Sequence, residues 1–249
     1  MSRAEMPRVY ELCDLIADRS SPSSYFQEDF DRSVASEARK KRVWLARERE
    51  FQRLDNAAWE FVKNEALPYL SARDSKGRGW EQLISILNQA RAYNYLVDRG
   101  CSDVRFVKRA KKQNRETPDL EAELDGATIV CEVKTLNASQ IEIERRQSGG
   151  VGSGTNVLSV PFLEKLDRTV EKAESQMLSY AGGDAEHTVF LILNFDDLLG
   201  EYKADYFGQI DDHLGSSHPT GANLVFYNQK TAFHRTLSMR LAEVVNEPN

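Results

Sequence analysis

Two acids and a lysine on either side of an expected β-hairpin are the residues of this sequence best suited to catalysis. The Asp-Gly pair at positions 125 and 126 is the strongest short-range hairpin signal in the chain, and it separates two expected strands. Counting back from this turn places Asp119 opposite about residue 132, beside Glu132. Lys134 follows two residues later, and alternate residues of a strand project to one face. The hairpin therefore predicts that two carboxylates and an ammonium group converge at one strand end.

This combination of groups is suited to hydrolysis of a phosphodiester bond. The carboxylates of Asp119 and Glu132, with the backbone carbonyl of Val133, are hard oxygen ligands of the kind that Mg²⁺ or Mn²⁺ prefers. The ammonium group of Lys134 can position or activate a water molecule and stabilise charge on a phosphate. We therefore expect a divalent metal site in which Lys134 assists the attacking water.

The spacing of these residues resembles a known signature. Pro118-Asp119, followed after twelve residues by Glu132-Val133-Lys134, is similar to the PD-(D/E)xK motif of the restriction-endonuclease-like nucleases. In that superfamily the second half of the motif lies on the third core strand, after an apolar run, as residues 128–134 do here. The resemblance covers about residues 80 to 195 and implies a Mg²⁺-dependent or Mn²⁺-dependent deoxyribonuclease.

A second motif points to the same superfamily. A helix is expected at residues 163–180, with an apolar side formed by Leu166, Val170, Ala173 and Met177. On this helix Gln176 and Tyr180 form a QxxxY pattern, in which residues four apart share one face. This resembles the QxxxY element of one branch, in which the glutamine orients the site and the tyrosine lies towards the nucleic acid. An ordinary amphipathic helix gives the same pattern, so this interpretation stays open as well.

The sequence also departs from the superfamily in two places. Many members carry a glutamate on the first core helix as an extra metal ligand, whereas this zone reads Asn88-Gln89-Ala90 and its nearest acid is Glu81. Members of the QxxxY branch often have a histidine in their first motif, and here the first histidine of the chain is His187. The number of metal ions and the branch are therefore left open.

A basic segment lies directly upstream of Asp119. Such a rim beside an acidic metal site suits the binding of a phosphate backbone, although a solvated loop has the same composition. The expected nucleic-acid-binding residues are Lys108, Arg109, Lys111, Lys112 and Arg115.

The elements that must position these residues form an α/β pattern. From residue 80 onward the expected order is helix, three strands, helix, strand, helix and strand, with a possible strand after these at 231–237. This predicts a restriction-endonuclease-like core, that is, a central mixed β-sheet flanked by helices. Residues 1–75 are rich in helix-forming residues, with one long helical stretch expected from about residue 33, so the expected division is a helical region at 1–75 and a nuclease-like domain at 76–249.

Composition limits the classes of protein that remain. The chain has 249 residues, a formal net charge of -6 and 41% hydrophobic residues, which is enough for a buried core. Its longest apolar run is far shorter than the roughly 20 residues that cross a bilayer, so we expect a cytoplasmic protein without membrane contact. Three widely spaced cysteines predict neither a disulfide framework nor a zinc ribbon.

Three interpretations follow from the sequence. The first is a metal-dependent nuclease that cleaves DNA, with RNA left open as a substrate. The second is a catalytically inactive nuclease-fold module that binds nucleic acid or a protein partner. The third is an interaction protein that forms a homodimer through its amino-terminal helices.

Overall fold

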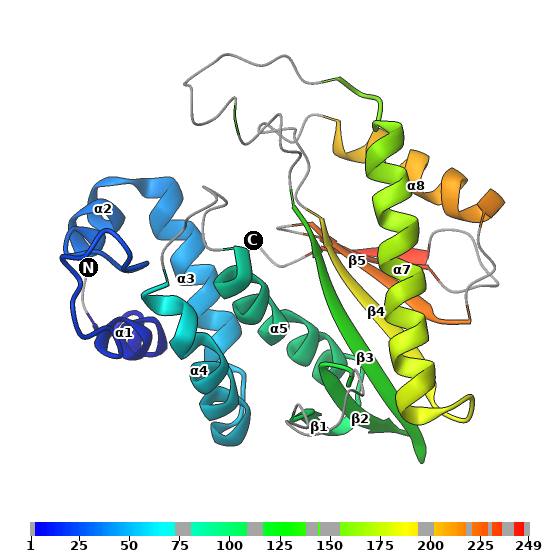
Figure 1. Ribbon diagram of the computed structural model, residues 1–249, viewed down its shortest axis with the longest axis horizontal. Coiled ribbons are helices and arrows are strands. Elements are labelled where there is room, and N and C mark those ends of the chain that lie inside the picture. The colour runs from blue at the N-terminus through cyan, green and yellow to red at the C-terminus, as the bar shows by residue number, and fades with distance from the viewer. Residues whose placement is uncertain are drawn as a thin grey trace. The chain divides into compact units, whose positions relative to one another are not determined.

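The chain forms two compact units, residues 1–101 and 102–249, and each is described by itself (Figure 1). The structure is a computed structural model. It describes residues 3–72, 81–108, 117–137, 144, 155–193, 202–217, 221–228, 231–235 and 242–246.

The amino-terminal unit is helical, as the sequence predicts. The long helical stretch expected after residue 33 is divided into three helices, because the backbone is extended at Glu37 and because Asp55 begins a new helix. The side chain of Asp55 accepts a hydrogen bond from the backbone N–H of Ala58 at 2.7 Å, which satisfies a donor that a helix start leaves open. The helices of this unit are α1 (Pro7–Asp14), α2 (Phe30–Ser36), α3 (Ala38–Gln52), α4 (Asn56–Leu70) and α5 (Glu81–Asp98).

Helix α5 belongs to the amino-terminal unit by its contacts. It packs against α4 and α3, so the compact unit extends to Cys101. The domain boundary expected from the sequence, between residues 75 and 76, lies outside the described residues.

The second unit is built on one mixed β-sheet, which confirms the expected α/β class. Seven strands lie in chain order, with β3, β4 and β5 parallel and the strands on either side antiparallel. They are β1 (Ser102–Phe106), β2 (Leu120–Leu124), β3 (Ala127–Leu136), β4 (Glu186–Leu193), β5 (Asn223–Asn228), β6 (Thr231–Arg235) and β7 (Ala242–Asn246).

The hairpin between β2 and β3 has the predicted turn and register. Asp125 and Gly126 have φ values of 52° and 82°, the left-handed conformations that a two-residue turn of this kind requires. Leu124 pairs with Ala127, and the last pair of the ladder joins Leu120 to Cys131. Strand β3 continues past this point beside β4, so its residues from Glu132 onward extend beyond the ladder with β2.

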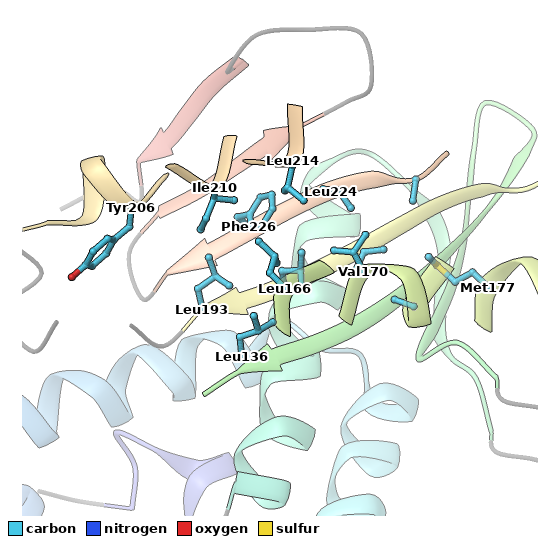
Figure 2. Packing of buried hydrophobic residues seen from close by; sticks show 14 of the residues in the cluster. Leu136, Leu166, Val170, Met177, Leu193, Tyr206, Ile210, Leu214, Leu224 and Phe226 are labelled. Carbon is cyan, nitrogen blue, oxygen red and sulfur yellow. The ribbon is translucent and has the colours of Figure 1, made fainter. Parts of the chain in front are cut away.

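In the part of this unit that the structure describes, helices α7 (Val160–Ala181) and α8 (Lys203–Ser217) accompany the sheet. Helix α7 packs on β3 and β4 through the apolar side of the helix, which includes Leu166, Val170 and Met177 as the sequence spacing predicts. Together with α8 and the central strands these residues form a buried apolar cluster (Figure 2). On β3 the cluster includes Val130 and Leu136. Because alternate residues of a strand share a face, Glu132 and Lys134 lie between these two on the same face.

No helix among the described residues is long and apolar enough to cross a membrane.

Candidate functional site

The two acids singled out in the sequence lie together where β2 begins. The backbone N–H of Asp119 donates to the carbonyl of Cys131 at 3.1 Å, and its carboxylate Oδ2 accepts from the N–H of Val133 at 2.9 Å. The N–H and C=O groups of one strand residue point to the same edge, so the carbonyl of Val133 is directed towards the side of Asp119. The ladder of β2 and β3 ends at the pair Leu120–Cys131, and Asp119 lies just beyond it, near enough to Glu132 for its carboxylate to raise the pKa of that residue.

Glu132 is a buried acid held by two donors. Only 3% of the residue is exposed, and it lies between Val130 and Leu136 on the face of β3 that α7 covers. Lys134, two residues further along that face, donates to Oε1, and the side-chain amide of Gln176 donates to Oε2 at 2.9 Å. Lysine and glutamine thus approach the carboxylate from different elements, the strand itself and helix α7.

The pKa of Glu132 is raised to about 7. The main cause is burial, which disfavours the charged form, and the second is repulsion by the carboxylate of Asp119. Lys134 and the amide of Gln176 act in the opposite direction without cancelling the rise. In the folded protein the donors to Glu132 therefore do not offset the cost of its negative charge, and a cation placed between the two acids would stabilise that charge.

Gln176, the first residue of the QxxxY pattern, contacts the buried acid. Its amide Nε2 donates to Glu132 and also to the backbone carbonyl of Thr117, at 2.6 Å. Gln176 lies on the buried side of α7, in line with Ala173 and Met177. It therefore ties the helix both to the acid of β3 and to the segment that leads into Asp119.

Tyr180 is placed differently. Its hydroxyl donates at 2.9 Å to Oε1 of Glu121, a residue of β2, and Glu121 also accepts from Arg105 of β1 at 2.9 Å. Tyr180 thus lies one helical turn from Gln176 and meets a second carboxylate. The sequence interpretation missed Glu121 and Arg105. The signal was present, since counting back from the turn pairs Glu121 with Val130 and so puts it on the same face of the sheet as Glu132.

The donors at Asp119 and Glu132 fit a divalent metal ion of the magnesium type. Two carboxylates and the carbonyl of Val133 are all oxygen ligands, and Mg²⁺ commonly uses one or two carboxylates while keeping waters or substrate phosphates. Within the described ranges no group of three or more His, Cys, Asp or Glu side chains is arranged to hold a metal. The protein itself would therefore fill only part of the coordination shell.

Asn88, which stands where the superfamily that the motif resembles often carries a glutamate, has a partner within the amino-terminal unit. Its side-chain oxygen accepts from Arg47, which also pairs with Glu50, and Arg91 pairs with Glu50 at 2.8 Å. Asn88 is buried and belongs to this polar network between α3 and α5.

Of the expected nucleic-acid-binding residues, only Lys108 lies in the described part of the chain, where it is exposed. The other four, Arg109, Lys111, Lys112 and Arg115, lie outside the described residues.

Comparison with known proteins gives no relative for this chain: no family model, no curated protein and no solved structure matches it.

Proposed function

We propose that this protein is a metal-dependent nuclease that hydrolyses phosphodiester bonds of DNA. The observation that carries the proposal is the position of Glu132, buried between Lys134 and Gln176 with the carboxylate of Asp119 near enough to raise its pKa. Keeping two carboxylates close in a buried place is unfavourable, as the raised pKa of Glu132 reflects. Such an arrangement is typical of a functional site, where a cation compensates for the repulsion.

Each residue has a separate task in this proposal. Asp119, Glu132 and the carbonyl of Val133 would hold Mg²⁺ or Mn²⁺. When bound, the ion supplies polarisation of the phosphodiester and neutralises charge that develops on it. Lys134 orients the attacking water and stabilises negative charge on the phosphate, while Gln176 fixes the orientation of the Glu132 carboxylate through its bond to Oε2.

The same proposal extends to the fold and to the substrate. The helix, the three strands, the helix and the strand from α5 to β4 have the order expected of a restriction-endonuclease-like core. DNA is preferred as substrate because most families with the resembling motif act on DNA. The basic segment at 108–115 supports a phosphate-backbone contact by its charge and its position directly before Asp119.

One observation favours a catalytically inactive binding module instead. Both carboxylate oxygens of Glu132 already receive a hydrogen bond from a protein donor, so the site is partly neutralised without a metal ion. Carboxylate oxygens accept more than one hydrogen bond each, so Glu132 keeps acceptor capacity for a cation. A module of this kind would bind DNA without cleaving it.

Paired variants separate these two possibilities. Asp119→Ala and Glu132→Ala should each abolish DNA cleavage while leaving the melting temperature of the metal-free protein nearly unchanged. Glu123→Ala removes an exposed carboxylate from the same strand as the hairpin turn and is the matched control, expected to cleave normally. Cleavage by either site variant at the rate of the control would contradict the proposal.

Lys134→Ala tests the division of tasks. An ammonium group is no metal ligand, so the variant should lose cleavage while keeping its affinity for Mn²⁺ in a calorimetric titration. A loss of Mn²⁺ affinity as large as that of Glu132→Ala would show that Lys134 acts through the metal site instead.

A further inference from the structure

A second carboxylate on the same face of the sheet holds two donors that are suited to a phosphate. Glu121 accepts from the guanidinium of Arg105 at Oε2 and from the hydroxyl of Tyr180 at Oε1, each at 2.9 Å. The two donors come from different elements, strand β1 and helix α7, and each is directed at one oxygen of the same anion. Arginine and tyrosine are common donors to the oxygens of a nucleic-acid backbone.

The donors and the acid differ in exposure. The side chain of Arg105 is 58% exposed, whereas that of Glu121 is 17% exposed. An ion pair with so exposed a partner contributes little net stability, because water competes for both charges. Arg105 can therefore exchange the carboxylate for another anion at small cost, and a planar guanidinium binds phosphate as readily as carboxylate.

The location of this set connects it to the metal site. Glu121 pairs with Val130, so it is the diagonal neighbour of Glu132 on the face that α7 covers, roughly 7–8 Å away in a regular ladder. Tyr180 and Gln176 lie one turn apart on α7. The donors around Glu121 and those around Glu132 thus follow each other along one face of the sheet. Their separation is comparable to that of consecutive phosphates in a nucleic-acid strand.

We infer that Arg105 and Tyr180 form a second phosphate-binding subsite for the nucleic-acid strand, and that Glu121 occupies this subsite until the strand binds. The inference rests on the proposed function, since it takes the neighbouring acids as the cleavage site. In the free protein Glu121 stands in for a phosphate. When the strand binds, its phosphate replaces the carboxylate on both donors, so Glu121 acts as a resident competitor that lowers affinity.

The test is the affinity of the full chain for a fluorescent DNA duplex, with chelator present so that no cleavage occurs. Glu121→Gln should bind roughly three to ten times more tightly than wild type and should steepen the slope of log affinity against log salt by about one unit, because the charge of Glu121 no longer offsets one of the positive charges that release counterions from the phosphates. Glu123→Gln, which makes the same charge change on the same face of β2, is the control and should give a much smaller increase. In the Glu121→Gln background, Arg105→Gln or Tyr180→Phe should remove most of the gain.

Arg105→Gln alone gives a second readout that does not depend on changing Glu121. Because Arg105 is exposed, the variant should fold normally and bind DNA several times more weakly than wild type, whereas a purely structural ion pair predicts unchanged affinity. Equal affinities of Glu121→Gln and Glu123→Gln would overturn the inference, and wild-type cleavage with Mg²⁺ would then leave the proposed function standing. A wild-type protein that neither binds nor cleaves DNA would overturn both.

Discussion

Glu48 and Glu132 are two buried glutamates in different units, and their surroundings give them different roles. Glu48, on α3, is 1% exposed and Glu132, on β3, is 3% exposed. Glu48 accepts from the backbone N–H groups of Arg8 and Val9 at 3.2 and 2.9 Å, and from the amide of Gln52 at 2.9 Å. Arg8 and Val9 lie in the first turn of helix α1, so Glu48 satisfies donors that a helix start leaves open. The positive end of the helix dipole also favours a negative charge there.

Glu132 has a lysine and an amide as donors, and a second acid opposite. Burial and Asp119 raise its pKa to about 7, so its charged form is disfavoured in the metal-free fold. Equal burial therefore does not decide whether a carboxylate is structural. The neighbours decide it: backbone N–H groups at a helix start make Glu48 part of the fold, whereas a nearby acid makes Glu132 a group that a cation would stabilise.

The largest expected difference between the two regions is in the pH dependence of stability without metal. The pKa of Glu132 in the folded protein lies above its ordinary value of 4.5, so the folded state holds a proton that the unfolded state has released. Its contribution to stability is therefore present below pH 4.5 and is lost as the pH rises towards 7, by up to about 3 kcal/mol. Between pH 5 and pH 8, the free energy of unfolding measured in urea should fall for wild type relative to that of Glu132→Gln. Parallel curves for the two proteins would contradict the account.

At a fixed pH of 8 the same substitution should have opposite effects in the two regions. Glu48→Gln should lower the free energy of unfolding by about 2 kcal/mol. The amide replaces one accepting oxygen by an NH₂ group, so one of the backbone N–H groups that Glu48 binds loses its acceptor and faces another donor. Glu132→Gln should be neutral or stabilising, because it removes the repulsion with Asp119 while keeping an acceptor for Gln176. Equilibrium unfolding in urea measures both, and a destabilised Glu132→Gln protein would assign this residue a structural role like that of Glu48.

A smaller effect is expected from added metal. A ligand that binds only the folded state at ten times its dissociation constant stabilises by about 1.4 kcal/mol. Mn²⁺ should therefore raise the melting temperature of wild type and of Glu48→Gln by similar amounts, and it should leave Asp119→Ala and Glu132→Gln unchanged. An equal rise in all four proteins would place the ion elsewhere in the molecule.

Much of the second unit could be predicted because its signals are local. The Asp-Gly turn specified the conformations at 125 and 126, and these set the ladder up to the pair Leu120–Cys131, just beyond which Asp119 lies near Glu132. Periodicity of apolar residues predicted the buried side of α7, which places Gln176 at Glu132.

Other features depend on contacts between distant residues. The breaks between α2, α3 and α4 depend on backbone conformation at Glu37 and on the cap by Asp55, and neither is a glycine or proline signal. The contact of Tyr180 with Glu121 joins residues 59 apart in sequence, so helix spacing alone does not reveal it. The buried hydrogen bond from Arg47 to Asn88 likewise joins residues that are distant in sequence.

Cleavage of DNA by the wild-type protein tests the central claim most directly. Linear and circular DNA should be incubated with purified protein in Mg²⁺, in Mn²⁺ and in excess chelator, with Asp119→Ala as the inactive control and Glu48→Gln as the folded, active one. The account predicts cleavage by wild type and Glu48→Gln only when metal is present, and a rate at least about a hundredfold lower for Asp119→Ala, since even outer-shell partners of a metal typically contribute 10–100-fold. Cleavage that persists in chelator, cleavage by Asp119→Ala at the wild-type rate, or intact DNA under every condition would contradict it.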